Sequence, residues 1–316
     1  MSGSHVRARA GDWIAVDWGT TTMRAALVAD DGTVRARAPT GPGMSELARD
    51  GAGPEGYERA LLDAIAPWRA DRAVDALVCG MAGAWDGGWE RVPYCRVPRS
   101  LDDLLGAAKR VVTRDRHLHV RIVPGLSTRT HQPGDVPDVM RGEETQLLGL
   151  LQRVPDAGRV CLPGTHAKWA RLEGGHVLGF RTHMTGELNA LLTRHSVLRS
   201  TLGDGEGFDA ASFDRAVEVA LDARGAVLDR LFAIRAGAML EHGVGGAQSR
   251  AALSGLLIGA EVAREADEPD LVHLVGGGEL TALYARALEL AGRESERHDG
   301  GDLSVAGLAA MRQGER

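Results

Sequence analysis

An aspartate and a run of small hydroxyl residues stand close together near the start of the chain, in the stretch Ile14 to Leu27 with the sequence IAVDWGTTTMRAAL. Asp17 ends an apolar run, and Gly19 with three threonines leads into a second apolar run, which predicts strand, tight turn, strand. A glycine and small hydroxyl residues let backbone N–H groups approach a phosphate, and a carboxylate at a strand tip can hold Mg²⁺. An ordinary β-hairpin explains the same residues equally well.

The pattern occurs a second time, beginning at Val160. The stretch VCLPGTHAKWARLEGGHVLGF aligns with IAVDWGTTTMRAALVADDGTV when its Gly-Thr pair is set over Gly19-Thr20, with one short deletion. Self-similarity between two halves of a chain is typical of a duplicated domain. Two such turns facing each other across a cleft would hold a polyphosphate from both sides. Leu162 replaces Asp17 in the second copy, so Asp17 is the only metal ligand that we predict.

Two adjacent glutamates, Glu143 and Glu144, stand in the stretch Met140 to Thr145, directly before the predicted helix Gln146 to Gln152. Carboxylates at a helix N-terminus interact favourably with the helix dipole, which is a purely structural role. The two residues by themselves indicate this structural role.

A glycine triplet follows the predicted strand Leu271 to Val275. Gly276, Gly277 and Gly278 precede a predicted helix, Leu280 to Leu290. Without side chains, the turn would let adenine or ribose lie against the backbone, with the α-phosphate at the helix N-terminus. A simple turn is the alternative. We predict an adenosine site.

Composition limits the function classes. The 316 residues suit two domains, and the 44% hydrophobic and 25% charged residues are ordinary for a globular enzyme. The net charge of -6 argues against nucleic-acid binding. Cys79, Cys95 and Cys161 are widely spaced, which indicates free thiols in a reducing compartment. No apolar run reaches the length of a membrane span, and the opening residues have no signal-peptide core, so we expect a cytoplasmic protein.

Six short stretches of the sequence, spread along the chain, resemble those of one protein family. The chain resembles the 2-dehydro-3-deoxygalactonokinase family of the sugar kinase, hexokinase and actin superfamily over nearly its whole length, Trp13 to Met311. The phrases that carry the resemblance are DWGTTTMRA, MAGAWDGGWERVPY, RGEETQLLG, LPGTHAKW, MTGELNALL and LSGLLIGAEVA. The resemblance implies an α/β fold of two duplicated ribonuclease-H-like (actin/hexokinase-type) domains with an interdomain cleft. We place the N-terminal domain at 12–155 and the C-terminal domain at 156–316, with the last helix near the hinge.

The resemblance also implies the reaction and its residues. It predicts ATP- and Mg²⁺-dependent phosphorylation of the 6-hydroxyl of 2-dehydro-3-deoxy-D-galactonate, in galactonate and galactose breakdown. By position it favours Glu144 over Glu143 as base, although the wider superfamily generally has the shorter aspartate there. The predicted ATP- and phosphate-binding residues are Gly19, Thr20, Thr21, Arg24, Gly164, Thr165, His166, Lys168, Gly276, Gly277 and Gly278. The predicted substrate-binding residues are Met81, Trp89, Tyr94, Arg141 and Arg181.

Structural explanations exist for several of these substrate residues. Trp89 and Tyr94 could instead form a hydrophobic patch that fixes a loop. Arg141 could pair with Glu143 instead of with the substrate's carboxylate. Two other functions also stay open: a kinase for another sugar or sugar acid such as 2-dehydro-3-deoxygluconate, and a non-catalytic sugar-sensing protein. A homodimer is compatible with the sequence, but no pattern specifies one.

Overall fold

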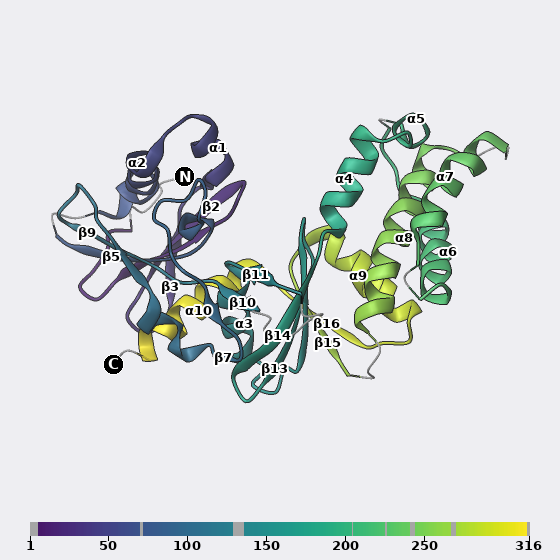
Figure 1. Ribbon diagram of the computed structural model, residues 1–316. Coiled ribbons are helices and arrows are strands. Elements are labelled where there is room, and N and C mark those ends of the chain that lie inside the picture. The colour runs from purple at the N-terminus through teal and green to yellow at the C-terminus, as the bar shows by residue number, and fades with distance from the viewer. Residues whose placement is uncertain are drawn as a thin grey trace. The chain divides into compact units, whose positions relative to one another are not determined.

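The structure is a computed structural model that describes residues 6–69, 72–128, 136–203, 205–224, 226–240, 244–266 and 270–314. The chain divides into two compact units (Figure 1). Unit 1 comprises Met1–Ala157, Leu172–Phe180 and Gly300–Arg316, and unit 2 comprises Gly158–Arg171 and Arg181–Asp299. Among the described residues, no helix has both the length and the hydropathy that a membrane span requires.

A seven-stranded sheet forms the centre of unit 1. Its strands lie in the order β3-β2-β1-β5-β9-β8, and β4 pairs with β2. β1 is antiparallel to β2 and parallel to β5, which in turn is parallel to β9. The strands are β1 (Trp13–Trp18), β2 (Thr22–Val28), β3 (Val34–Arg37), β4 (Gly41–Pro42), β5 (Val74–Gly80), β8 (Lys109–Val111) and β9 (Leu118–Ile122).

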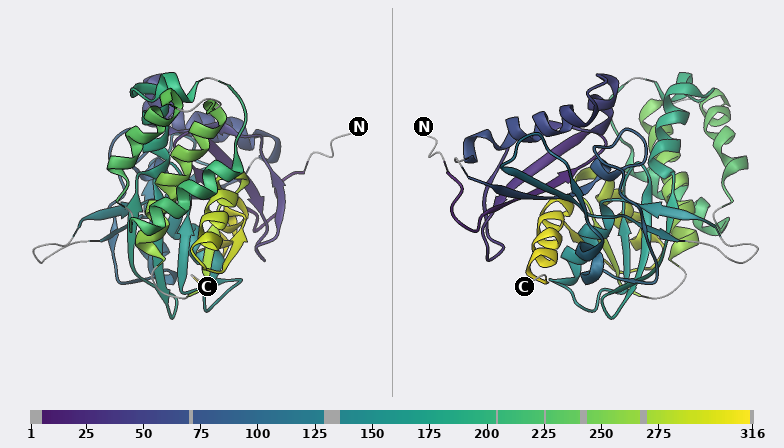
Figure 2. Two further views of the ribbon diagram at one scale, coloured as in Figure 1. Left: turned by 90° about the vertical axis from the view of Figure 1, so that its right-hand side faces the viewer. Right: turned by 60° about the vertical axis from the view of Figure 1, so that its left-hand side comes forward.

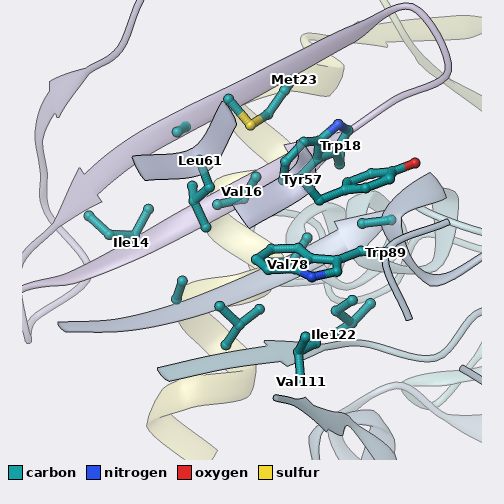
Figure 3. Packing of buried hydrophobic residues seen from close by; sticks show 14 of the residues in the cluster. Ile14, Val16, Trp18, Met23, Tyr57, Leu61, Val78, Trp89, Val111 and Ile122 are labelled. Atoms are coloured by element: carbon teal, nitrogen blue, oxygen red, sulfur yellow. The ribbon is translucent and has the colours of Figure 1, made fainter. Parts of the chain in front are cut away.

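Side-chain alternation along β1 assigns its residues to the two faces of this sheet. Ile14, Val16 and Trp18 share one face, where they join a buried cluster with Leu61 from α2 (Gly53–Ile65) (Figure 3). Helices α2 and α10 cover opposite faces, as the right-hand view of Figure 2 shows. Asp17, one residue out of phase with that cluster, therefore faces α10.

The helix α10 (Gly300–Gly314) packs against α3 (Glu143–Leu151) at two glycines. A Cβ at Gly307 would lie 2.0 Å from the carbonyl oxygen of Thr145, and a Cβ at Gly149 would lie 2.1 Å from that of Leu303. Any larger residue would force the helices apart, so these glycines set their close approach. This contact holds the residues that follow Glu143 in place.

Shorter elements complete unit 1. A three-stranded sheet has the order β11-β10-β6. A 3₁₀ helix, Asp102–Ala107, precedes β8, whose residues Lys109–Val111 pair with β9. The remaining elements are β6 (Cys95–Arg96), β7 (Arg99–Ser100), β10 (Leu126–Thr128), β11 (Asp138–Met140), α1 (Met44–Arg49), and the 3₁₀ helices Ala66–Trp68 and Met81–Gly83.

The second sheet repeats the strand arrangement of the first. Its order is β16-β15-β12-β13-β14-β7. β12 is antiparallel to β13 and parallel to β15, and β15 is parallel to β16, as β1 is to β2 and β5, and β5 to β9. The strands are β12 (Arg159–Leu162), β13 (Ala167–Glu173), β14 (His176–His183), β15 (Val272–Val275) and β16 (Ser295–His298). The shared order agrees with the predicted duplication.

Helices make up most of the rest of unit 2. The core pair is α6 and α8, which lie side by side in Figures 1 and 2. Small residues permit this contact: a Cβ at Gly255 would lie 2.5 Å from the carbonyl oxygen of Phe213. The helices are α4 (Thr185–His195), α5 (Arg199–Leu202), α6 (Ala210–Asp222), α7 (Leu228–Leu240), α8 (Gly246–Glu265) and α9 (Gly278–Leu290).

The compact units differ in one respect from the domains predicted at 12–155 and 156–316. The main division, between Ala157 and Gly158, lies close to the predicted boundary. The segments Leu172–Phe180 and Gly300–Arg316 are grouped with unit 1 instead of unit 2. For the last helix the reason is its packing on α3.

Candidate active site

The first Gly-Thr turn is a tight connection between β1 and β2 in unit 1. The N–H of Gly19 donates to the carbonyl oxygen of Thr22 at 2.8 Å. The backbone of α1 approaches closely at Gly43, where a Cβ would lie 2.2 Å from the carbonyl carbon of Thr21. Thr20 and Thr21 remain exposed. The turn is thus braced from behind while its tip is open to a ligand.

Asp17 lies at the end of β1, beside this turn. The Ser304 hydroxyl of α10 donates to Asp17 Oδ2 at 3.0 Å, and Arg24 Nη1 lies 3.9 Å from the same oxygen. Burial raises the pKa of Asp17, while the Ser304 hydrogen bond and the Arg24 charge act in the opposite direction. The other carboxylate oxygen is not engaged by these contacts. Mg²⁺ in phosphoryl-transfer sites commonly uses one or two carboxylates plus phosphates and waters, so the donor fits that ion.

Glu144 is a buried carboxyl group in the first turn of α3, 0% exposed. Its Oε2 accepts from the Gly142 N–H at 2.7 Å, and its Oε1 accepts from the Thr145 hydroxyl at 3.0 Å. Burial, and secondarily the charge of Glu143, raises the pKa of Glu144 to about 8. A carboxyl group with this pKa is mostly protonated at neutral pH, and only its ionised fraction can accept a proton.

Glu143 is placed differently from its neighbour. Its side chain is partly exposed, and its Oε2 accepts from the backbone N–H of Arg141 at 2.8 Å. The structure thus brings both predicted bases together on one helical turn, with one carboxyl group buried and one accessible.

Arg141 is a buried cation whose guanidinium is only partly hydrogen bonded by the residues that the structure describes. Its side chain is 8% exposed, and Nη2 donates to the carbonyl oxygen of Val92 at 2.6 Å. Nε and Nη1 have no hydrogen-bond partner among the residues that the structure describes. Gly83 leaves the space beside Nη1, since a Cβ there would lie 2.6 Å from it. Unpaired buried guanidinium N–H groups are costly, so the site is suited to an anionic ligand.

Tyr94 extends this arginine site toward a surface hollow. The Arg141 guanidinium stacks over the Tyr94 ring, 4.3 Å from its centroid. The hollow is lined by Tyr94, Arg96, Ser127, Thr128, Pro137, Asp138 and Val139. The sequence did not single out Ser127 and Thr128 as site residues. They line the hollow only because β10 lies between β6 and β11 in the folded sheet.

Trp89 belongs to the core and not to this hollow. It is 3% exposed and stacks on Tyr57, with ring centroids 6.1 Å apart, next to Trp18 (Figure 3). Burial favours the role that the sequence left open for it, fixing the loop after β5. Met81, in the 3₁₀ helix that begins that loop, is partly exposed.

The second Gly-Thr turn connects β12 and β13 in unit 2. Thr165 and His166 are exposed, and His166 Nε2 contacts Glu187 Oε2 at 2.5 Å. The start of α4 lies directly behind the turn, because a Cβ at Gly186 would lie 2.5 Å from the carbonyl oxygen of Gly164. Lys168 is 5% exposed, and its Nζ donates to the His166 carbonyl oxygen at 3.1 Å. The tip of the turn is therefore exposed, and the hydrogen bond from Lys168 helps to hold the backbone of the turn in place.

Arg181 is in unit 2, whereas Arg141 is in unit 1. Arg181 Nη1 donates to Glu265 Oε1 at 2.6 Å, and His183 Nε2 lies 3.0 Å from the same oxygen. These contacts lower the pKa of Glu265, against the opposing effect of its burial. Arg181 therefore already has a carboxylate partner.

Glu261, one turn earlier in α8, is a buried carboxyl group that accepts several hydrogen bonds and that the sequence did not single out. It accepts from Trp169 Nε1 at 2.6 Å, from the Tyr284 hydroxyl at 2.7 Å and from the Thr185 hydroxyl. The available signal was a pair of glutamates, Glu261 and Glu265, four residues apart after a mostly apolar stretch of the helix. Glu261 joins β13, α4 and α9, the elements that carry the second turn and the glycine triplet.

The glycine triplet follows β15 and opens α9. Gly277 is the N-cap, Gly278 has φ +69°, and both are exposed. No described heavy atom lies within 4 Å of a Cβ added at either position, leaving out each glycine, its chain neighbours and nearby backbone of its own helix. Free N–H groups at an uncrowded helix N-terminus form a favourable site for a phosphate.

The chain is similar to known proteins over nearly its whole length. The sequence model of the family described as 2-keto-3-deoxy-galactonokinase matches residues 17–311. A Rhizobium meliloti protein named as a probable 2-dehydro-3-deoxygalactonokinase is 39% identical over 307 residues, covering 95% of this chain and 96% of the relative. The Escherichia coli 2-dehydro-3-deoxygalactonokinase is 34% identical over 302 residues, covering 95% and 97%. A crystal structure from Sinorhizobium meliloti, described as the same kind of kinase, superposes with a TM-score of 0.84 at 38% identity, covering 95% and 97%.

Proposed function

Because the chain belongs to the 2-keto-3-deoxy-galactonokinase family, we propose that it transfers the γ-phosphoryl group of ATP to the 6-hydroxyl of 2-dehydro-3-deoxy-D-galactonate. The proposal rests mainly on the environment of the Arg141 guanidinium. A sugar acid differs from a neutral sugar by its carboxylate, and Arg141 Nε and Nη1 are buried donors with no partner among the described residues. Guanidinium N–H groups form strong, charge-assisted hydrogen bonds with a carboxylate. Tyr94 and the polar residues of the adjoining hollow would contact the rest of the substrate.

The attacking hydroxyl needs a carboxylate base. Glu144 is our first candidate, because it stands at the position that the family resemblance favours. Its ionised fraction, the form that accepts a proton, grows as pH approaches its pKa of about 8. Both of its oxygens are already hydrogen bonded, so the hydroxyl would have to replace Thr145 or Gly142 as its partner. Glu143 is the second candidate, because its carboxylate is partly exposed and lies on the same helical turn.

Phosphate and nucleotide contacts are proposed for each unit by itself. In unit 1, Gly19, Thr20, Thr21 and Arg24 would bind phosphate oxygens through backbone N–H groups and a guanidinium. In unit 2, the turn residues Gly164, Thr165 and His166, with Lys168, would contact phosphate, and the exposed glycine triplet at α9 would contact adenosine.

Asp17 would hold Mg²⁺, directly or through water. The ion would neutralise phosphate charge when bound. Asp17 and Ser304 belong to β1 and α10, so the helix orients the carboxylate before any ion arrives.

We also propose a cytoplasmic location. ATP is the phosphate donor of the proposed reaction, and Cys79 and Cys161 are buried free thiols whose pKa is raised by burial. Thiols of this kind persist in reducing compartments.

The direct test is ADP release with ATP and Mg²⁺ on a panel of 2-dehydro-3-deoxygalactonate, its gluconate epimer, galactonate and a neutral hexose. We expect strong selectivity for the first compound. Arg141→Lys should lower kcat/KM for it by at least about 30-fold, because truncating one partner of a buried charge pair costs about 2 kcal/mol or more. Arg110→Lys, an exposed arginine change in the same unit, is the matched control. Equal rates on acid and neutral sugars, or an unchanged Arg141→Lys enzyme, would contradict the proposal.

The glycine triplet has a test that separates binding from folding. Gly277 is an N-cap with open space around it, and asparagine is a favourable N-cap residue. Gly277→Asn should therefore leave the Tm unchanged or higher while raising the KM for ATP. An unchanged KM would remove the triplet from the nucleotide site.

A further inference from the structure

Two histidines and a glutamate meet on β15 and β16 in unit 2, close to the glycine triplet but with no role assigned above. β16 is the edge strand of its sheet, and it pairs in parallel with β15. His273 is directly opposite Glu296, while His298 is opposite Val275, two positions further along. Because side chains at alternate positions share a face of a sheet, the three side chains project to the same side.

Their donor atoms are close enough to share one ion. His273 Nδ1 lies 3.1 Å from His298 Nε2 and 3.7 Å from Glu296 Oε2. All three donor atoms lie within 4.8 Å of one another. Ligands about 2.0–2.1 Å from Zn²⁺ in a tetrahedral arrangement are separated by roughly 3.3 Å. The two distances therefore bracket the spacing that such an ion requires.

The hydrogen bond between the two imidazole rings is compatible with an ion. Neutral imidazole is the form that binds metals. Without an ion, one ring must donate a hydrogen bond to the other; a tautomer shift moves that proton to the far ring nitrogen and frees both lone pairs.

We propose that His273, Glu296 and His298 bind one divalent transition-metal ion, with Zn²⁺ as the best match. Two imidazoles and one carboxylate are a donor set of known zinc sites, and they leave a fourth position for water. His273 is 4% exposed, while the Glu296 side chain is 55% exposed, so the ion can enter from the solvent side. The site is separate from the Mg²⁺ proposed at Asp17, which has only oxygen ligands.

A bound ion would hold the edge strand β16 against β15 next to the glycine triplet. The N–H of Gly276, the first residue of the glycine triplet, donates to the carbonyl oxygen of His298 at 2.9 Å. Coordination of the His298 ring would hold β16 against β15 directly before that triplet. The expected effect is stabilisation of unit 2 by mass action of the ion.

The experiment uses the full chain, stripped of metal with a chelator and then dialysed against Zn²⁺. Metal content is measured by mass spectrometry, and Tm is followed as Zn²⁺ is raised. The wild type should retain about one equivalent more Zn²⁺ than His298→Gln, and its Tm should rise with Zn²⁺ while that of the variant does not. Glu296→Gln, a change at an exposed side chain, should weaken Zn²⁺ affinity about tenfold or more.

His119→Gln is the matched control. His119 Nδ1 contacts Asp75 Oδ1 at 3.3 Å on neighbouring strands of unit 1, with both side chains about half exposed. This variant should bind Zn²⁺ like the wild type. Equal Zn²⁺ content in the wild type and His298→Gln, or an equal Zn²⁺-dependent rise in Tm, would overturn the proposal and leave a hydrogen-bonded histidine pair.

Discussion

Glu144→Gln should change how the stability of the protein depends on pH. The pKa of Glu144 is about 8 in the folded protein, against an ordinary value of 4.5. The folded protein therefore keeps a proton that the unfolded chain releases, and stability falls as pH rises between these two values. The slope is about 1.4 kcal/mol per pH unit, so the total is on the order of 5 kcal/mol by pH 8, with no further loss from this group above it. Glutamine does not titrate, so the variant should lack this slope.

The assay is urea unfolding of both proteins at intervals from about pH 5 to pH 9, with the difference in unfolding free energy taken at each pH so that other titrating groups cancel. Glu143→Gln is the matched control. It should keep most of the slope, because burial outranks the Glu143 charge as the cause of the raised pKa of Glu144. Parallel pH profiles for the wild type and Glu144→Gln would refute the reasoning, and would mean that Glu144 is hydrated in the folded protein.

Three other substitutions test single features. Asp17→Asn should weaken Mg²⁺-dependent nucleotide binding measured by calorimetry, because an amide oxygen carries no charge; unchanged binding would exclude the metal role. Gly307→Ala should lower the free energy of unfolding in urea by about 1–3 kcal/mol or more, because its Cβ would lie 2.0 Å from the Thr145 carbonyl oxygen. Gly314 is the control, since it has open space on the same helix and its change to alanine should be nearly neutral. Equal effects of the two substitutions would contradict the packing argument. Glu261→Ala should cost about 3 kcal/mol or more, since it leaves three buried donors unpaired; a loss below about 1 kcal/mol would show that water replaces the carboxylate.

The sequence by itself determined the local pattern around each turn. Gly19 and Gly164 mark the two hairpins, because a short Gly-Thr connection between apolar runs allows few backbone arrangements. The helices of the second half were predictable for a similar reason, since apolar residues recur at helical spacing in α6 and α8. The resemblance of whole phrases then fixed the family, which comparison over residues 17–311 supports.

Only the tertiary structure decided what each candidate side chain contacts. Trp89 and Tyr94 look equivalent in the sequence, yet one is 3% exposed and the other 37%, because the stacking of Trp89 on Tyr57 requires the α2 helix. The sequence also left open whether Arg141 would pair with Glu143. In the fold, Nη2 donates to the Val92 carbonyl oxygen, and Nε and Nη1 have no hydrogen-bond partner within the part of the chain that the structure describes.

Contacts between segments far apart in the sequence account for the features that could not be predicted. Ser304 reaches Asp17 across 287 residues, and His273 meets His298 only because β15 and β16 pair in a particular register. A sequence carries no local signal for such contacts, since they depend on which strands become neighbours and on which face each side chain points to. The chemistry of individual residues was therefore readable from their types and spacing, while their burial, pKa and partners were set by packing.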